Sequence, residues 1–358
     1  MTAGSAVAPN EERPPGGQRP SIGRSSQSQD SDGPRPPRSL RPRAELDTVD
    51  RRIIELLGHD GRLRNRALAA DIGVTEATVA MRIQTMANRR ILGVTAVLDW
   101  EAAGYAWDLW IGVTVEVGGH SLAEVADELA SMPSVHSVQM VFGPVDLVVH
   151  ALLADRAEAV DFISEKISAV SGVRRARPSV VLETVKYTAQ FARVPVSPRE
   201  LRLPAPRVEL DDLDRQIVGA LVVDGRQSNR AVGRSLNVSE ATVRVRLRRM
   251  EDAGLLRIIG QSDPYLAGLV NAWAYIGVDV DSGAVRAVSQ RLAAVSEVTI
   301  VAITAGRHDI LVLVAAASRT RLIELIVQEI RSIPGVRATE TSEVAQTVRL
   351  NYQWARLV

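Results

Sequence analysis

The 358-residue sequence contains no cysteine, which excludes disulfide bonds, thiolate nucleophiles and cysteine-ligated zinc. No apolar run approaches the roughly 18 residues needed to cross a bilayer, and the N-terminus lacks the hydrophobic core of a signal peptide. We therefore expect a cytoplasmic protein with no membrane partner. Walker, G-x-S-x-G and GxGxxG sequences are missing too, and the carboxylates follow no paired acid/base pattern, so we expect neither an enzyme nor a cofactor.

Histidine is scarce and the net charge is close to zero. The histidines lack the H-x-x-x-H or HExxH spacing of a metal site, so no metal is expected. These histidines are His59, His120, His136, His150 and His308. With a formal net charge of +1, any contact with nucleic acid has to come from local clusters of arginine rather than from a basic molecule as a whole.

The main feature of the sequence is a stretch that occurs twice, at Asn65 to Met86 and at Asn229 to Met250. Each copy is predicted to form two short helices joined by a tight turn. The second helix begins with a hydroxyl residue, Thr75 or Ser239, that can cap exposed backbone N–H groups. Apolar residues recur along this helix at i, i+4 and i+7 and form one stripe, which leaves the opposite face free. The pattern is typical of a helix-turn-helix whose second helix lies in the major groove of DNA.

The repeat extends well beyond this stretch. Asp47 to Gly104 aligns without gaps on Asp211 to Gly268, with 22 identities in 58 positions. An apolar, β-branched strand follows each helix-turn-helix and suits a wing. The order βαββαβ comes next and predicts an antiparallel four-stranded sheet with both helices on one face. The fold class is therefore α+β in a tandem duplication, and the second copy is the natural cover for the bare face of each sheet.

The predicted domains follow from this repeat. They are a disordered tail at 1–43, a first winged helix-turn-helix at 44–104, a first βαββαβ domain at 105–193, a proline-rich linker at 194–208, a second winged helix-turn-helix at 209–268 and a second βαββαβ domain at 269–358.

These residues resemble the leucine-responsive and asparagine-responsive (Lrp/AsnC) family of transcription regulators. The matching landmarks, each present twice, are LD-x-x-D from Leu46 and Leu210, DGR, V-[ST]-E-A-T-V-x-x-R from Val74 and Val238, and a G-x-x-D between sheet strands. The resemblance implies winged domains that bind double-stranded DNA and sensing domains of the dimeric α/β-barrel type. It also implies a homo-oligomer that regulates transcription in response to a small effector such as an amino acid.

The resemblance assigns DNA-binding residues to both copies. They are Thr75, Thr78, Arg82, Ser239, Thr242, Arg244, Arg246, Arg248 and Arg249. Arginine can hold guanine bidentately and any cation can hold a phosphate, although a solvated helix face is the alternative for each single residue. Because the second copy has more arginine, we predict that it supplies more of the salt-dependent affinity and that the operator has unequal half-sites.

The effector-binding residues implied by the family lie in the two G-x-x-D turns. They are Gly143, Asp146, Gly306, Arg307, His308 and Asp309. Glycine permits a close backbone approach, aspartate can accept an ammonium group, and Arg307 can hold a carboxylate, so the second copy is the favoured site. The alternative is a pair of hairpin turns whose aspartates bind backbone N–H groups.

One departure from the family pattern concerns the end of the recognition helix. The family has Glu-x-x-Gly there, as at Glu251 and Gly254, whereas the first copy has Ala87 and Arg90. We therefore expect the first wing to leave its helix differently. Two other functions remain open at this point: a sirohaem-decarboxylase-like enzyme on the same fold, and an effector-binding protein that no longer binds DNA.

Overall fold

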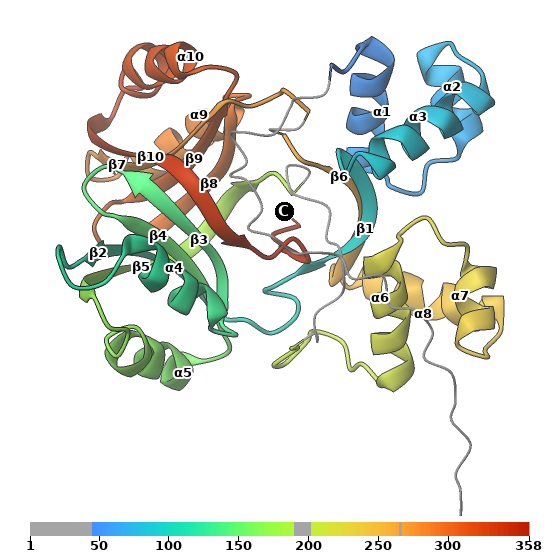
Figure 1. Ribbon diagram of the computed structural model, residues 1–358, viewed down its shortest axis with the longest axis horizontal. Coiled ribbons are helices and arrows are strands. Elements are labelled where there is room, and N and C mark those ends of the chain that lie inside the picture. The colour runs from blue at the N-terminus through green and yellow to red at the C-terminus, as the bar shows by residue number, and fades with distance from the viewer. Residues whose placement is uncertain (1–44, 190–201, 265–266, 358) are drawn as a thin grey trace, which may run out of the picture. The chain divides into compact units, whose positions relative to one another are not determined.

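The computed structural model describes residues 45–189, 202–264 and 267–357 (Figure 1). The predicted tail at 1–43 and the first part of the predicted linker, 194–201, lie outside these residues. The remaining linker residues, 202–208, have no regular secondary structure. Leu203 and Val208 pack against a buried apolar cluster, and the Arg207 N–H donates to the Ala102 carbonyl at 2.7 Å. This part of the linker is therefore packed against the protein.

Two similar three-helix units are present, each followed by one strand. The first contains α1 (Thr48–His59), α2 (Asn65–Ile72), α3 (Glu76–Asn88) and β1 (Leu92–Asp99). The second contains α6 (Asp212–Val223), α7 (Asn229–Ser235), α8 (Glu240–Asp252) and β6 (Leu256–Ser262). Both units start in the same way. The Asp47 side chain caps α1 by accepting the backbone N–H of Asp50, and the Asp211 side chain caps α6 by accepting that of Asp214.

The strands that follow the two units pair with each other. β1 and β6 run antiparallel from Leu92↔Ser262 to Leu98↔Leu256, and Figure 1 shows them side by side between the two sets of helices. A short strand, β11 (Trp354–Ala355), joins β1 in parallel at the other edge. This last strand has no sequence signal that we recognised, since two residues carry no periodicity.

Each wing strand packs on both units. Leu92 at the start of β1 belongs to the core of the first unit, whereas Leu98 at its end packs with Leu221 of α6. In the same way β6 crosses to α1, where a Cβ on Gly260 would lie 2.8 Å from the Leu57 Cβ. The sequence predicts two separate winged helices, but the structure forms one paired module with exchanged packing.

The βαββαβ halves form a single closed barrel of eight strands. The first half supplies β2 (Trp107–Val115), β3 (Val135–Phe142), β4 (Leu147–Leu153) and β5 (Val173–Tyr187). The second supplies β7 (Ala272–Val280), β8 (Val298–Ala305), β9 (Ile310–Ala316) and β10 (Val336–Leu350). Hydrogen bonds between β5 and β8 and between β10 and β3 close the circle, so the two sheets join edge to edge.

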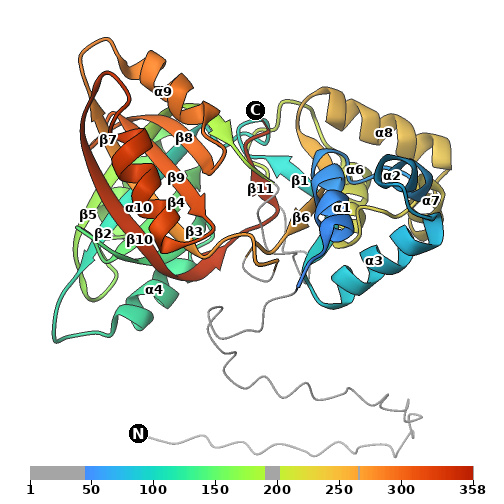
Figure 2. The same cartoon turned by 90° about the horizontal axis from the view of Figure 1, so that it is seen from above.

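The barrel helices lie outside the strands, as Figure 2 shows for α10. They are α4 (Leu122–Ser131), α5 (Arg156–Asp161), α9 (Val285–Ala294) and α10 (Arg319–Glu324). α5 and α10 each continue as a π-helical segment, at Phe162–Lys166 and Leu325–Ile330. Their apolar faces make two clusters with the outward-facing strand residues, and a third cluster around Trp110 and Tyr275 fills part of the interior.

The expected difference at the end of the first recognition helix is wrong. Arg90 adopts the left-handed φ of 56°, and Gly254 adopts 69° at the matching position. The Ile91 and Leu255 N–H groups then bond to Met86 and Met250 at 2.9 and 3.0 Å. Both wings leave in the same way, and the arginine accepts a backbone strain of about 1 to 2 kcal/mol that glycine avoids.

Within the residues that the structure describes, no helix combines the length and apolar character needed to cross a membrane.

Candidate DNA-reading surface and effector cavity

The hydroxyl residues at the start of each recognition helix act as caps. Thr75 Oγ1 accepts the Thr78 N–H at 3.1 Å and lies 2.9 Å from Thr78 Oγ1. Ser239 and Thr242 repeat this arrangement at 3.0 and 2.8 Å. These bonds satisfy backbone donors that a helix start leaves free. The first turn is thus held at the surface where the helix would approach DNA.

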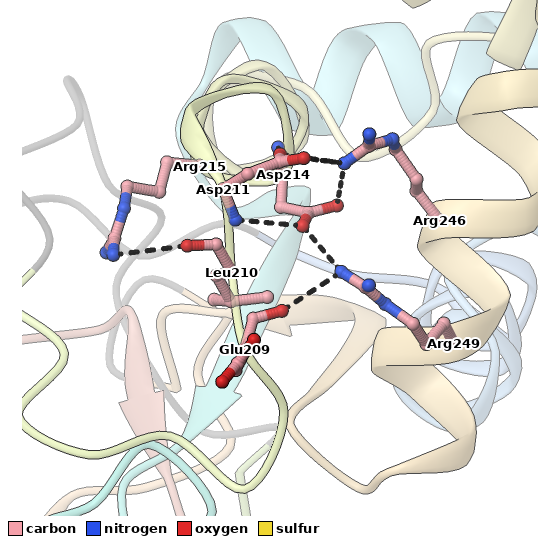
Figure 3. A network of polar contacts seen from close by, with 7 residues as sticks. All are labelled: Glu209, Leu210, Asp211, Asp214, Arg215, Arg246 and Arg249. Carbon is pink, nitrogen blue, oxygen red and sulfur yellow. Dashed lines mark hydrogen bonds and ion pairs between the residues drawn. The ribbon is translucent and has the colours of Figure 1, made fainter.

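Three of the predicted DNA-contacting arginines pair with carboxylates at the start of the first helix of their own unit. Arg82 Nη1 lies 2.8 Å from Asp47 and 3.2 Å from Asp50. Arg246 Nη1 lies 2.6 Å from Asp211 and 3.0 Å from Asp214. Figure 3 shows the second network, in which Arg249 reaches the other oxygen of Asp214 and the Glu209 carbonyl.

The carboxylates in these networks are strongly held. The Asp214 side chain is 1% exposed, so its charge requires the two guanidinium groups as partners. The Arg246 side chain and the Asp214 backbone N–H lower the pKa of Asp211 below its ordinary value. These ion pairs connect helices within each unit: Arg82 of α3 connects to the start of α1, and Arg246 and Arg249 of α8 connect to the start of α6.

The remaining arginines of α8 point to solvent. Arg244 is exposed and has no ion pair within residues 45–189, 202–264 and 267–357, and Arg248 is 81% exposed beside Asp252 at 3.8 Å. The first recognition helix has Ala80 and Gln84 at the matching positions. The two surfaces therefore differ in free positive charge.

The two units hold each other through reciprocal arginines. Arg62 donates to the Gly225 carbonyl at 3.1 Å, the Gln227 carbonyl at 2.9 Å and Asn229 Oδ1 at 2.8 Å. Its partner in the second copy, Arg226, donates to Gly61 and Leu63 carbonyls and to Asn65 Oδ1, at 3.3, 3.1 and 2.8 Å. Burial lowers the pKa of both guanidinium groups. We call these six hydrogen bonds the arginine clasp.

Sequence reasoning missed the role of the clasp residues. DGR served only as a family landmark, and the asparagines were assigned no function. A signal was present, because Asp-Gly-Arg-x-x-Asn occurs at 60–65 and again at 224–229. Its meaning depends on a contact between copies, which a local pattern does not reveal.

The aspartates of the two G-x-x-D turns bind the backbone of neighbouring strands. Asp146 Oδ2 accepts the Val115 N–H at 2.8 Å, and Asp309 Oδ2 accepts the Val280 N–H at 2.9 Å. These are the bonds of the hairpin alternative. The glycines approach the opposite copy: a Cβ on Gly143 would lie 2.8 Å from the Thr341 carbonyl, and one on Gly306 would lie 2.5 Å from Ser179 Oγ.

Two other predicted effector residues line a cavity in the barrel. Arg307 pairs with Glu340, while His308 bonds to Asp279 through Nδ1 at 2.9 Å and to Glu340 through Nε2 at 3.3 Å. The cavity has about 560 Å³ of space, and its further walls include Arg177, Ser179, Ser342, Trp110 and Tyr275. Arg177 is exposed and has no ion pair in the described part of the chain. We call this space the charged cavity.

Comparison with known proteins assigns the domains that carry these surfaces to a family. Family models match the chain as an AsnC-type helix-turn-helix domain at 46–87 and 210–251, an Lrp/AsnC ligand binding domain at 111–191 and a C-terminal dimeric alpha+beta barrel domain at 271–357. An uncharacterised HTH-type transcriptional regulator of Pyrococcus furiosus is 37% identical over 144 residues, which is 40% of this chain and 97% of that protein. The chain belongs to the Lrp/AsnC family. Its domains are those of a transcription regulator of this type, with two helix-turn-helix regions in one polypeptide.

Two further similarities define the scale of the duplication. The HTH-type transcriptional regulator FL11 of Pyrococcus horikoshii is 32% identical over 150 residues, covering 42% of this chain and 97% of that protein. Such relatives have the length of a single copy. The siroheme decarboxylase NirDL has a crystal structure that covers 85% of this chain and 93% of its own, with a TM-score of 0.59 and 15% identity. That likeness shows a shared fold.

Proposed function

We propose that this regulator reads double-stranded DNA with its own two recognition helices as an internal pair. The observation that carries the proposal is the arginine clasp together with the β1–β6 pairing, because both fix α3 and α8 in one module. A palindrome reader normally obtains its second helix from a partner chain. Here the pair has unequal surfaces, with Arg244 and Arg248 on α8 only, so the expected operator has two unequal half-sites. We expect the protein to bind this DNA in the cytoplasm.

Fluorescence anisotropy tests DNA reading first. The full chain is titrated against a labelled duplex from its own upstream region and against a scrambled duplex, at low and at physiological salt. We expect the upstream duplex to bind more tightly than the scrambled one at both salt concentrations. Phosphate contacts are common to the two duplexes and weaken steeply with salt, so a difference that persists at physiological salt reports sequence reading. Equal and salt-sensitive binding of both duplexes would contradict sequence reading.

Half-site exchange then tests the internal pair. Each half of the footprinted operator is replaced by an inverted copy of the other to give two strict palindromes. An internal pair of different helices should bind both palindromes more weakly than the natural site, since one helix always meets the wrong half. If one palindrome binds more tightly than the natural operator, like copies from two chains pair instead.

We infer that the charged cavity binds a small zwitterion such as an amino acid. Arg177 is available for the carboxylate, and Glu340 can accept the ammonium group by exchanging part of its bonding with Arg307 and His308. Asp146 and Asp309 position the turns in this proposal, since each accepts a backbone N–H. Calorimetric titration with the common amino acids tests it, with Arg177→Gln expected to weaken binding at least tenfold. The exposed Arg174→Gln on the same strand is the matched control.

Regulation without catalysis is the remaining part of the proposal. It is supported by the named regulators among the relatives and by the two helix-turn-helix domains. The protein is expected to form no stable complex with an iron tetrapyrrole, measured as a shift of the Soret band on mixing. A stoichiometric shift would favour the decarboxylase-like alternative. Association of whole chains into a homo-oligomer is expected from the family and is measured by analytical ultracentrifugation.

A further inference from the structure

The barrel interior contains a second cavity next to the charged one. It has about 700 Å³ of space, a figure that includes solvent at its open side. Trp110 and Tyr275, from matching strands of the two copies, line both cavities and stand between them with ring centroids 5.3 Å apart. The two spaces therefore differ in chemistry although they share a wall.

Apart from the two histidines His136 and His150, none of the side chains found to line this second cavity in the described part of the chain is of a charged residue type. Three of its polar lining residues come from one strand, β3, where His136, Ser137 and Gln139 are 3%, 1% and 5% exposed. Leu313 and Ile300 provide apolar surface opposite. We call this space the neutral cavity. Its described lining offers no carboxylate, lysine or arginine side chain to pair with a zwitterion, so transfer of a zwitterion from water into it is unfavourable.

His136 contributes hydrogen-bonding capacity that the described residues do not use. Its Nδ1 is buried and has no hydrogen-bond partner among them, a rare and costly condition inside a protein. Burial, with help from the positive field of His150 and Arg349, keeps the pKa of His136 well below its ordinary value, so the ring is neutral at pH 7. Nearby, Gln139 accepts a weak bond from Ser137 Oγ at 3.4 Å, and its amide nitrogen has no partner among the described residues.

One wall of the neutral cavity is a stack of flat rings. His150 lies parallel to Trp110, with centroids 4.1 Å apart and an interplanar angle of 6°. Its Nε2 is fixed by Asp108 Oδ1 at 2.6 Å, which holds the ring in place. Flat aromatic faces favour a flat aromatic ligand, because offset stacking adds to the gain from burial.

We propose that the neutral cavity binds an uncharged, flat heteroaromatic molecule through ring stacking and hydrogen bonds to His136 and Gln139. This second ligand site goes beyond the zwitterion site in the charged cavity and depends neither on it nor on DNA reading.

Calorimetry with the full chain in the absence of DNA tests the proposal, with indole and quinoline as neutral probes. L-tryptophan is the comparison, because it carries the indole ring together with a zwitterion. We expect at least one neutral probe to bind at a stoichiometry of one and at least tenfold more tightly than L-tryptophan. If neither probe binds, or if L-tryptophan competes with indole on equal terms, the proposal is overturned.

Matched variants locate the binding. Val344 lines the neutral cavity, so Val344→Phe should fill it and abolish binding of the neutral probe. Val327→Phe makes the same change at a position that is 55% exposed, and it should leave the affinity unchanged. His136→Phe should weaken binding at least tenfold. Thermal melting shows that each variant is folded, and if His136→Phe is not, the pair of valine variants decides: equal affinity in both would overturn the assignment.

Failure here and failure of the proposed function are distinguishable. Loss of indole binding in Val344→Phe is measured without DNA, and Arg177→Gln in the charged cavity should leave indole binding unchanged. If Arg177→Gln weakens indole binding as much as Val344→Phe does, the ligand occupies the charged cavity and the neutral site is refuted.

Discussion

Removing Arg62 should loosen the paired helix-turn-helix module. Arg62 makes three hydrogen bonds to the second unit, to two backbone carbonyls and to Asn229. At about 1 kcal/mol net for each bond, Arg62→Ala should lower the free energy of unfolding by about 3 kcal/mol. Arg62→Lys keeps the charge but cannot present a planar fork to three acceptors, so it should lose about 2 kcal/mol.

Urea titration of the full chain measures this loss, with Arg66→Ala as the control. Arg66 lies close to Arg62 in the sequence, is exposed and has no ion pair within the residues that the structure describes. Its removal should therefore change the free energy of unfolding by less than about 0.5 kcal/mol. Equal losses for Arg62→Ala and Arg66→Ala would refute the assignment of the clasp.

The same variant has a consequence for DNA reading. With the clasp weakened, α3 and α8 are held at one separation mainly by the β1–β6 pairing and are less firmly fixed. Affinity for a duplex containing both half-sites should therefore fall more than affinity for a duplex containing one, as measured by anisotropy. A uniform fall for both duplexes would mean that Arg62 affects one recognition surface and not the pairing of two.

Three further outcomes are expected. Arg90→Gly should raise the free energy of unfolding by about 1 kcal/mol, measured in urea, because φ is 56° there; a loss of stability would contradict the assigned strain. Burial lowers the pKa of His136 in the folded state, so below about pH 6.5 the unfolded state binds more protons than the folded state. The free energy of unfolding should therefore decrease as the pH is lowered through this range, by at most ~1.4 kcal/mol per pH unit. That loss should vanish in His136→Phe and persist in His120→Phe, as followed by melting between pH 7 and 5. Replacing Arg244 and Arg248 by alanine should reduce the slope of log affinity against log salt by about 2, and an unchanged slope in a salt series of anisotropy titrations would show that neither residue contacts phosphate.

Local pattern was sufficient for most of the secondary structure. The second helix predicted within Asn65 to Met86 is α3 (Glu76–Asn88), and the order βαββαβ predicted for 105–193 is the order in which β2, α4, β3, β4, α5 and β5 follow one another. Helical and strand periodicities report burial on one face, which neighbouring residues determine. The duplication added the fold class, because two βαββαβ sheets with bare faces have to cover each other.

The hydrogen-bond and ion-pair partners of individual side chains could not be derived from local sequence pattern. Arg246 is predicted to contact DNA, and the structure adds ion pairs with Asp211 and Asp214, 35 and 32 residues earlier, that the sequence pattern did not predict. A sequence shows that a side chain is cationic, but the acceptor that it meets depends on where another helix begins in space. The same holds for Asp146, which binds the Val115 N–H of a neighbouring strand.

The sequence by itself determined that this protein is a tandem Lrp/AsnC regulator, since motifs and periodicities are properties of short stretches and survive any rearrangement of the copies. Tertiary structure decided how the copies meet. It exchanged the packing of the wing strands, turned two DGR motifs into the arginine clasp, and closed two sheets into a barrel with one charged and one neutral cavity. Each of these depends on contacts between residues more than a hundred positions apart, whose free energy is available only once the chain has folded.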